Sequence, residues 1–194
     1  LAMSSLLRGL SAAGKVLPVC SKSSDFTFSG HAMTFSVRRI DHAVYWVRDV
    51  DISKNFYTRI LGLEEVVSDN GMCLLRAPGS EQHHDLGLFQ TGASAARTPR
   101  GAVGLYHIAW KVNSIEDIAA AFYVLQREHA LTGASSHGAT KSVYGTDPDG
   151  NELEITFTIP RADWGQWENG GTVEPLDLAA ELARYGKQPH QGKT

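Results

Sequence analysis

A repeated segment that contains a histidine constrains this sequence more than any other feature. Ile40-Asp-His-Ala-Val-Tyr-Trp-Val47 and Leu105-Tyr-His-Ile-Ala-Trp-Lys-Val112 share the pattern apolar-x-His-apolar-apolar-x-x-Val, and their histidines, His42 and His107, are 65 positions apart. Both segments have the residue types of a β-strand. Each copy is too short to bury a sheet face by itself, so the two copies are expected to pack or pair with one another.

The residues that follow each histidine strand predict the same order of elements in both copies. Asp51 is placed to cap a first helix that ends at Gly62, and a second helix is expected to begin near Ser114. Short strand patterns follow each helix, although one strand of the second copy, near Ala134, is poorly marked. The expected strands lie at 64–67, 72–76 and 85–90 in the first copy and at 142–146 and 152–157 in the second.

The sequence therefore predicts an α+β protein with two tandem βαβββ modules, at residues 38–91 and 104–158, that form one curved mixed sheet. Asp147-Pro-Asp-Gly150 is expected to be the turn between the last two strands. Proline pre-sets the backbone of such a turn, and glycine tolerates the positive φ that ends it.

The two ends of the chain differ from the modules. Residues 1–37, which are rich in Ser, Gly and Ala, are expected to form a disordered N-terminal extension. A basic, acid-poor segment of this kind is also typical of an organelle transit peptide, so both interpretations stay open. Residues 159–194 are expected to be a C-terminal extension, in which Trp164 and Trp167 pack on the domain or a partner and a short helix follows Pro175.

Composition narrows the functional classes. The 194-residue chain carries 18 Lys and Arg against 21 Asp and Glu, a net charge of −3, so it offers no excess of basic residues for a nucleic-acid partner. No apolar run reaches the roughly 20 residues of a membrane span. The two cysteines, Cys20 and Cys73, suggest neither a disulfide framework nor a zinc knuckle, which favours a reducing compartment and the cytoplasm.

Two histidines and one glutamate are candidates for metal ligands. His42 and His107 occupy matching strand positions in the two modules, so they are expected to face one cavity. Glu154 lies between apolar residues in the middle of the last strand and needs a partner, whereas Glu152 lies near the turn and is expected to be solvated. Two imidazoles and one carboxylate form the facial ligand set of non-haem Fe(II), so the predicted sheet surrounds a metal cavity.

Further titratable groups are placed to serve the same cavity. His83 and His84 open a strand of the first module, Tyr144 stands ten positions before Glu154, and His137 begins the loop ahead of Tyr144. A histidine beside a metal that is not itself a ligand moves protons near neutral pH, and a tyrosine donates a hydrogen bond. A solvated strand end for the histidine pair and a surface loop for His137 stay open as alternatives.

These residues give positions 38–158 a resemblance to the vicinal oxygen chelate superfamily. Asp147-Pro-Asp-Gly-Asn-Glu-Leu-Glu154 resembles the closing hairpin of that superfamily, with the ligand glutamate at its end. Other features resemble its small single-domain type I extradiol dioxygenases. They are His84-Asp85-Leu-Gly-Leu88, Tyr144 three positions before Asp147, His137-Gly138, and the tail around Trp164–Leu182.

The resemblance implies an extradiol dioxygenase that inserts O₂ into a catechol-type aromatic diol, as in aromatic hydrocarbon catabolism. It implies Fe(II), with Mn(II) also compatible, as the metal held by His42, His107 and Glu154. His84 would relay a proton from the substrate hydroxyl. Tyr144 and His137 would hydrogen-bond the ring or the oxygen ligands. We further expect a homo-oligomer without nucleic-acid or membrane partners.

Other functional classes stay open. A metal-dependent isomerase or lyase of the glyoxalase or epimerase type needs a fourth Glu or Gln ligand on the fourth strand of the first module, where only Asp85 and Gln90 are available. A fosfomycin-type transferase has a threonine two positions after its first histidine, where this chain has Val44. The last class is a non-catalytic module that binds a small molecule, against which the presence of all three candidate ligands argues.

Overall fold

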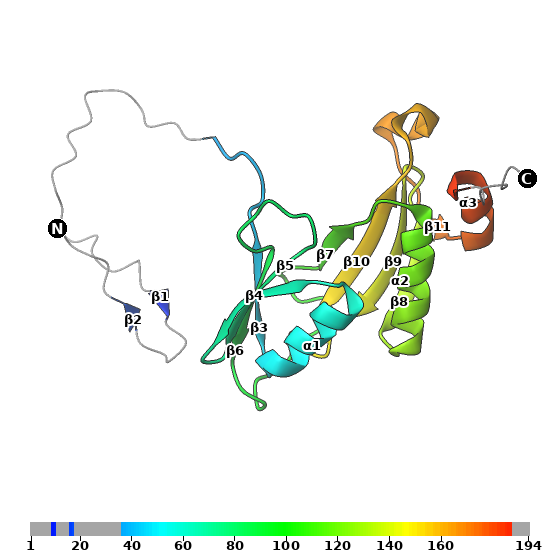
Figure 1. Ribbon diagram of the computed structural model, residues 1–194. Helices are drawn as coiled ribbons and strands as arrows, with labels where there is room; N and C mark the ends of the chain where they lie inside the picture. Colours follow the sequence, from blue (N-terminus) through cyan, green and yellow to red (C-terminus); the bar gives the residue numbers. More distant parts are fainter. Residues whose placement is uncertain (1–8, 11–15, 18–35, 188–194) are drawn as a thin grey trace, which may run out of the picture. The chain divides into compact units, whose positions relative to one another are not determined.

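The computed structural model describes residues 9–10, 16–17 and 36–187 (Figure 1). The N-terminal extension predicted at residues 1–37 therefore lies almost wholly outside the described residues. Its described parts include two short strands, β1 (Gly9–Leu10) and β2 (Val16–Leu17), which pair antiparallel. From residue 36 on, the chain forms two compact units. The first holds the residues up to Lys54 together with Gly62–Ser94, and the second holds Asn55–Leu61 and the residues from Ala95 on.

The first unit contains a four-stranded mixed sheet in the order β3-β6-β5-β4. β3 and β6 run parallel, and the other neighbouring strands run antiparallel. One helix, α1, follows β3 and continues from the first unit into the second. The elements are β3 (Ala43–Val47), α1 (Val50–Ile60), β4 (Glu64–Asp69), β5 (Met72–Arg76) and β6 (Leu86–Gln90).

Alternation along the strands decides which face of the first sheet is buried. In β3, Tyr45 and Val47 are buried, whereas Val44 and Trp46 between them are half exposed. Fully buried side chains of β5 and β6 complete this core: Cys73, Leu75, Leu86 and Leu88. The strand period of two therefore selects the apolar face, as the sequence pattern predicts.

The cap of α1 differs from the prediction. The side chain of Asp49, rather than that of Asp51, accepts hydrogen bonds from the backbone N–H groups of residues 51 and 52, both at 3.0 Å. The helix begins at Val50, which places Asp49 directly before the first helical residue. Asp51 lies inside the first turn, where its charge is favourable next to the positive end of the helix dipole.

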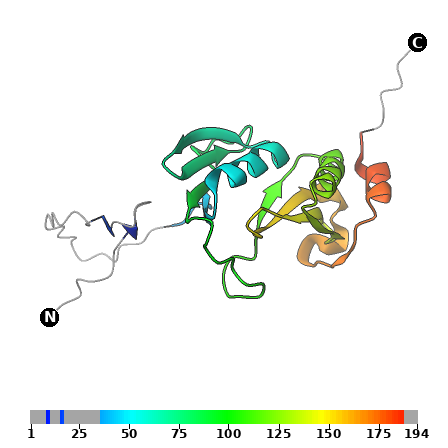
Figure 2. The same ribbon diagram turned by 90° about the horizontal axis from the view of Figure 1, so that it is seen from below.

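The second unit repeats the same order of elements and adds one strand. Its five-stranded sheet has the order β11-β8-β9-β10-β7, with β7 and β10 parallel. Figure 2 shows α2 along one face of this sheet. The elements are β7 (His107–Lys111), α2 (Ile115–Arg127), β8 (Leu131–Ser136), β9 (Thr140–Thr146), β10 (Glu152–Thr158) and β11 (Glu174–Pro175).

Local signals in the second module are confirmed. Ser114 caps α2 in a capping box with Asp117, which satisfies two N–H groups at the start of the helix. The turn after β9 is held by Asp147, whose backbone carbonyl accepts a hydrogen bond from the N–H of Gly150 at 3.0 Å. The strand near Ala134 that the sequence marks poorly is a six-residue strand, β8, with a bulge near its start.

The strands form two mixed sheets rather than the single curved sheet that the repeat predicts. Among the residues with described placement, β3 pairs with β6 and β7 pairs with β10, and no ladder joins the four-stranded sheet to the five-stranded sheet. The α+β class and the βαβββ order of both modules are confirmed. A repeat encodes the ladders within each module, but the pairing of one sheet edge with another is not local and leaves no pattern in the sequence.

The C-terminal extension returns to the second sheet. Two 3₁₀ turns, Arg161–Asp163 and Gly165–Asn169, lead to β11, which pairs with β8. The helix α3 (Leu178–Tyr185) then contacts α2, and Asp177 caps it, so the predicted short helix behind Pro175 is confirmed. Across the described residues, every helix is too short or too polar to cross a bilayer.

Candidate metal centre

The second sheet brings two predicted metal ligands into contact. In the parallel ladder, His107 of β7 lies opposite Glu152 of β10, and Glu154 follows two positions later on the same face. His107 Nε2 and Glu154 Oε2 are 3.0 Å apart. Their side chains are 25% and 12% exposed, so both are largely shielded but still reachable.

The spacing of these two atoms fits neighbouring ligands of one metal ion. Two ligands at right angles in a six-coordinate site, each about 2.1 Å from the ion, are about 3 Å apart. Imidazole nitrogen and carboxylate oxygen are also the donor types that Fe(II) and Mn(II) accept. Within the described part of the chain, no three His, Cys, Asp or Glu side chains are grouped as a complete metal site, so His107 and Glu154 form two thirds of the predicted set.

Tyr144 lies beside Glu154 and links it to His137. Tyr144 of β9 is the register partner of Glu154, which puts both side chains on one face of the sheet. The phenol oxygen of Tyr144 lies 3.1 Å from Glu154 Oε1 and 2.6 Å from His137 Nε2. Burial and the charge of Glu154 raise the pKa of Tyr144 to about 12, so its phenol stays protonated at neutral pH.

His137 is held at the tip of the β8–β9 hairpin. Its backbone N–H donates to the carbonyl of Thr140, and its ring Nδ1 lies 2.9 Å from the carbonyl oxygen of Thr172 in the C-terminal extension. The ring is partly buried. The surface-loop alternative for His137 therefore does not describe its side chain, which has a polar partner on each ring nitrogen.

The first unit holds a separate group of three histidines. His42 precedes β3 and His84 lies two residues before β6, and the parallel pairing of these strands brings the two rings to 4.4 Å between centroids. His42 Nδ1 contacts Asp41 Oδ2 at 2.9 Å, and His83 Nδ1 lies 3.1 Å from His84 Nδ1. Burial, with help from the neighbouring His42 and His83, lowers the pKa of His84 below its usual value.

The structure thus sorts the six predicted site residues into two clusters. We call His107, Glu154, Tyr144 and His137 the carboxylate cluster, which lies in the second unit. We call His42 and His84, with His83 and Asp41 beside them, the histidine cluster, which lies in the first unit. Of the three predicted ligands, one belongs to the histidine cluster and two belong to the carboxylate cluster.

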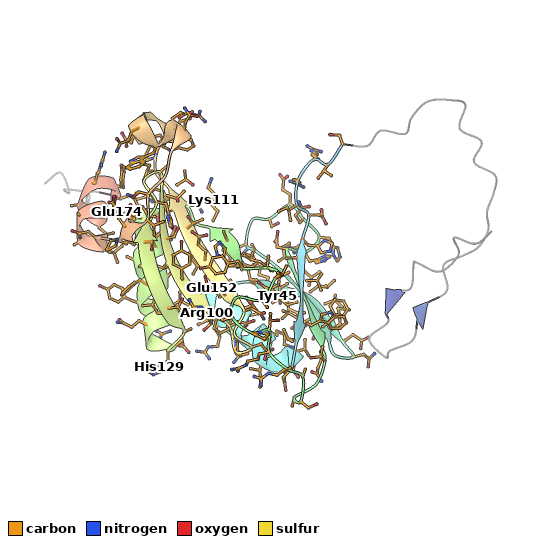
Figure 3. All side chains as sticks on the ribbon, turned by 180° about the vertical axis from the view of Figure 1, so that it is seen from behind. Tyr45, Arg100, Lys111, His129, Glu152 and Glu174 are labelled. Atoms are coloured by element: carbon orange, nitrogen blue, oxygen red, sulfur yellow. The ribbon has the colours of Figure 1, made fainter. Side chains whose placement is uncertain are left out.

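Glu152 is closer to the centre than the sequence predicts. The expectation that it is solvated is wrong, because its side chain is only 19% exposed and Oε1 lies 3.8 Å from His107 Nδ1. His107 Nδ1 is shielded from solvent and makes no hydrogen bond to any described residue. Figure 3 labels Glu152 at the start of β10, at the opposite end of the second sheet from Glu174 of β11. Its place in register with His107 is the signal that could have identified it.

Asp85 and Gln90, the two candidates for a fourth metal ligand, both form hydrogen bonds that hold the local backbone. Asp85 accepts hydrogen bonds from the backbone N–H of Ala77 at 2.8 Å and from the hydroxyl of Ser80 at 2.9 Å, which hold the loop between β5 and β6. The side-chain oxygen of Gln90 accepts from the backbone N–H of Val50 at the start of α1, at 3.1 Å. A metal ion would have to compete with these hydrogen bonds at both residues.

Comparison with known proteins identifies a family for this chain. Residues 39–155 match the family model described as "Glyoxalase/Bleomycin resistance protein/Dioxygenase superfamily". A catechol-2,3-dioxygenase of Bacillus subtilis (strain 168) is 27% identical over 153 residues, which are 77% of this chain and 53% of that protein. A biphenyl-2,3-diol 1,2-dioxygenase of Rhodococcus globerulus is 31% identical over 155 residues, which are 73% of this chain and 80% of that protein.

The solved structures support the fold alone. The crystal structure of a glyoxylase/bleomycin resistance protein/dioxygenase domain from Frankia sp. EAN1pec matches with a TM-score of 0.54 and 24% identity. The match covers 63% of this chain and 99% of that one. The chain spans about half the length of the Bacillus protein.

Proposed function

The chain belongs to the glyoxalase/bleomycin resistance protein/dioxygenase superfamily, and we propose that within it this protein is an extradiol dioxygenase that cleaves a catechol-type diol with O₂. The observation that carries the proposal is the unbroken set of polar contacts from His107 through Glu154 and Tyr144 to His137. It combines a ligand pair with two groups that donate or accept protons, as oxidative ring cleavage requires.

His42, His107 and Glu154 would hold Fe(II) or Mn(II), with three protein ligands and open positions for the reactants. The metal, when bound, would orient the diol and O₂ and allow electron density to pass from the aromatic ring to oxygen. The dioxygenase relatives support this assignment through their names, and the 3.0 Å separation of His107 Nε2 and Glu154 Oε2 supports it on chemical grounds.

The remaining residues would handle protons. His84, whose pKa is lowered by burial and neighbouring histidines, is suited to accept a proton from a substrate hydroxyl, because a neutral imidazole is a base. Tyr144 stays protonated and is suited to donate a hydrogen bond to oxygen on the substrate. His137 would position Tyr144 through the 2.6 Å contact at its hydroxyl.

The hydrogen bonds of Asp85 and Gln90 favour this proposal over an isomerase or lyase with four protein ligands. Both side chains are committed to the backbone around them, Asp85 to the β5–β6 loop and Gln90 to the start of α1. Releasing either one would leave backbone N–H groups without an acceptor, which is costly when they are shielded from water. A three-ligand site with open positions needs neither residue.

A ring-cleavage assay tests the proposal. The full chain is loaded with Fe(II) without oxygen, mixed with a panel of catechols that includes biphenyl-2,3-diol, and then exposed to O₂. We expect a coloured ring-opened product with one O₂ consumed per diol, and no product from the Glu154→Gln variant. Turnover of a methylglyoxal–thiol adduct without O₂ uptake, together with inert catechols, would contradict the proposal and favour the isomerase class.

A further inference from the structure

We infer that the C-terminal segment Trp164–Thr172 belongs to the active site, because the carbonyl oxygen of Thr172 fixes His137 in the tautomer that carries a proton on Nδ1. Nε2 is then the nitrogen that faces Tyr144. The catalytic meaning of this inference rests on the proposed function. The tautomer itself is a property of the folded chain and can be measured separately.

The atoms at His137 leave only one arrangement for the Nδ1 proton. A carbonyl oxygen only accepts hydrogen bonds, so the 2.9 Å contact between Nδ1 and Thr172 requires a proton on Nδ1. Nε2 of the same ring lies 2.6 Å from the Tyr144 hydroxyl, which is nearer to Tyr144 than Glu154 Oε1 at 3.1 Å.

Two hydrogen-bond patterns at Tyr144 are compatible with a proton on His137 Nδ1. With a neutral ring, Nε2 has a free lone pair and accepts the phenol proton over 2.6 Å. With a doubly protonated ring, Nε2 donates to the phenol oxygen, and the phenol donates to Glu154 Oε1 at 3.1 Å. In both patterns the Thr172 carbonyl accepts the Nδ1 proton, so the backbone of a distant segment acts on this series of contacts.

Trp167 fixes the distance between the C-terminal segment and the hairpin that carries His137. Its indole ring packs directly on Gly138, so closely that a methyl group at Gly138 would lie 2.4 Å from Trp167 Cδ2. Gly138 also has a φ of +82°, which the hairpin turn needs and other residues rarely adopt. Glycine thus serves both the turn and the close approach of the ring.

The segment is attached to the second unit on both sides of Trp167. On one side, the indole N–H of Trp164 donates to the carbonyl of Ile159 at 3.0 Å. On the other side, Glu174 and Pro175 of β11 pair with Ser136 and Ser135 of β8. Because the segment is attached on both sides, the Thr172 carbonyl is held in one position. A hydrogen-bond acceptor must be held in this way to determine which ring nitrogen carries the proton.

Nitrogen NMR of the histidine rings tests the inference on the full chain in its metal-free state. Two-bond ¹⁵N–¹H spectra distinguish a protonated ring nitrogen from one with a free lone pair, and the His137→Gln variant identifies the His137 signals. We expect wild-type His137 to carry a proton on Nδ1. A proton found on Nε2 instead would overturn the inference.

Substitutions at Trp167 test the origin of the tautomer. We expect Trp167→Ala to shift His137 toward the Nε2–H form that free histidine prefers in water. Trp167→Phe keeps a flat ring against Gly138 and should restore the wild-type spectrum. Gln166→Ala, an exposed neighbour in the same segment, is the matched control and should leave it unchanged. An unchanged spectrum in folded Trp167→Ala protein would overturn the inference.

Turnover measurements distinguish a failure of this inference from a failure of the proposed function. If the protein cleaves catechols, Trp167→Ala should lower kcat by about 10- to 100-fold, in the range for residues that orient catalytic groups, and Trp167→Phe should recover most of it. A wild-type rate in Trp167→Ala protein with a shifted tautomer would overturn the catalytic part of the inference. If no catechol is cleaved at all, the proposed function fails, but the NMR result still decides the tautomer.

Discussion

The two clusters of candidate site residues come from matching modules but are built differently. The members of the carboxylate cluster lie in strands or at a hairpin tip and form a continuous series of contacts of 3.0, 3.1 and 2.6 Å that ends at His137. In the histidine cluster, His42 and His84 lie just before their strands, and the partner of His42 is the exposed side chain of Asp41. The two clusters therefore differ in how well the contacts that hold their side chains are shielded from solvent.

This difference indicates where the metal site is preorganised. Glu154 is 12% exposed and has partners on both carboxylate oxygens, so its rotamer is set before a metal binds. His42 is 38% exposed, and its ion-pair partner is the exposed side chain of Asp41, a kind of contact that contributes little rigidity. If these residues hold a metal as proposed, we expect Glu154 to contribute more to its binding than His42.

Removal of the ligands in turn should give the largest effect. We expect Glu154→Ala to weaken Fe(II) binding by about 100-fold or more, since changes to groups outside the ligand shell already cost 10- to 100-fold. We expect His42→Ala to weaken binding less, because His42 is the less preorganised of the two proposed ligands. Competition with a coloured chelator under anaerobic conditions measures both dissociation constants. Equal losses of Fe(II) affinity in the two variants would contradict the expectation that Glu154 is better preorganised than His42.

His84 should affect rate without affecting metal content. It is not one of the three proposed ligands, and its lowered pKa suits a proton carrier. We expect His84→Gln to keep iron bound and to lower kcat by about 10²- to 10⁴-fold, which is the usual contribution of a general acid or base. Iron content and turnover measured on the same sample check this. Unchanged turnover would remove the proposed role of His84.

The local parts of the fold are predictable from the sequence because local signals determine them. The spacing of apolar residues, the Ser114 cap and the Asp147 turn each depend on a few neighbouring positions. The contact of His107 with Glu154 also follows from strand periodicity, once the two strands are known to be neighbours. The sequence pattern assigns the cap of α1 to Asp51, but Asp49 two positions earlier provides it, because a capping residue type alone does not fix where the first turn begins.

The parts that were missed depend on atoms far apart in the chain. The number of sheets depends on which strand edges pair, and the repeat is equally compatible with one sheet or two. The placement of Glu152 required the register between β7 and β10. The role of Thr172 rests on a backbone carbonyl, which every residue has, so no side-chain pattern could mark it 35 positions away from His137.

The two units also differ in how an aspartate at the end of a strand holds the neighbouring loop. Asp147 is buried and accepts four hydrogen bonds, from the backbone N–H groups of Asp149 and Asn151, from the Asn151 amide and from the Tyr57 hydroxyl. Burial raises its pKa in spite of these donors. Asp85, which precedes β6 in the first unit, is partly buried and accepts hydrogen bonds from Ala77 and Ser80. We therefore expect the turn in the second unit to depend more on its carboxylate.

Alanine at these two positions makes a matched pair. We expect Asp147→Ala to lower the free energy of unfolding by about 3 kcal/mol, because several shielded donors lose their acceptor, and Asp85→Ala to lower it by about 1 kcal/mol. Urea unfolding followed by circular dichroism measures both values. An equal or larger loss from Asp85→Ala than from Asp147→Ala would show that the first unit depends on its loop aspartate at least as strongly as the second, against this expectation.

Substitution of His83 should have the smallest effect on turnover among these variants. Its side chain is exposed, in contrast to the partly buried His84, although the two Nδ1 atoms are 3.1 Å apart. Because solvent can replace an exposed partner, we expect His83→Gln to change kcat by about twofold at most, which corresponds to about 0.5 kcal/mol. The measurement is the same turnover assay, with His84→Gln beside it. A loss of tenfold or more in His83→Gln would mean that His83 shares the proton with His84, and the histidine cluster would then act as a connected pair, as the carboxylate cluster does.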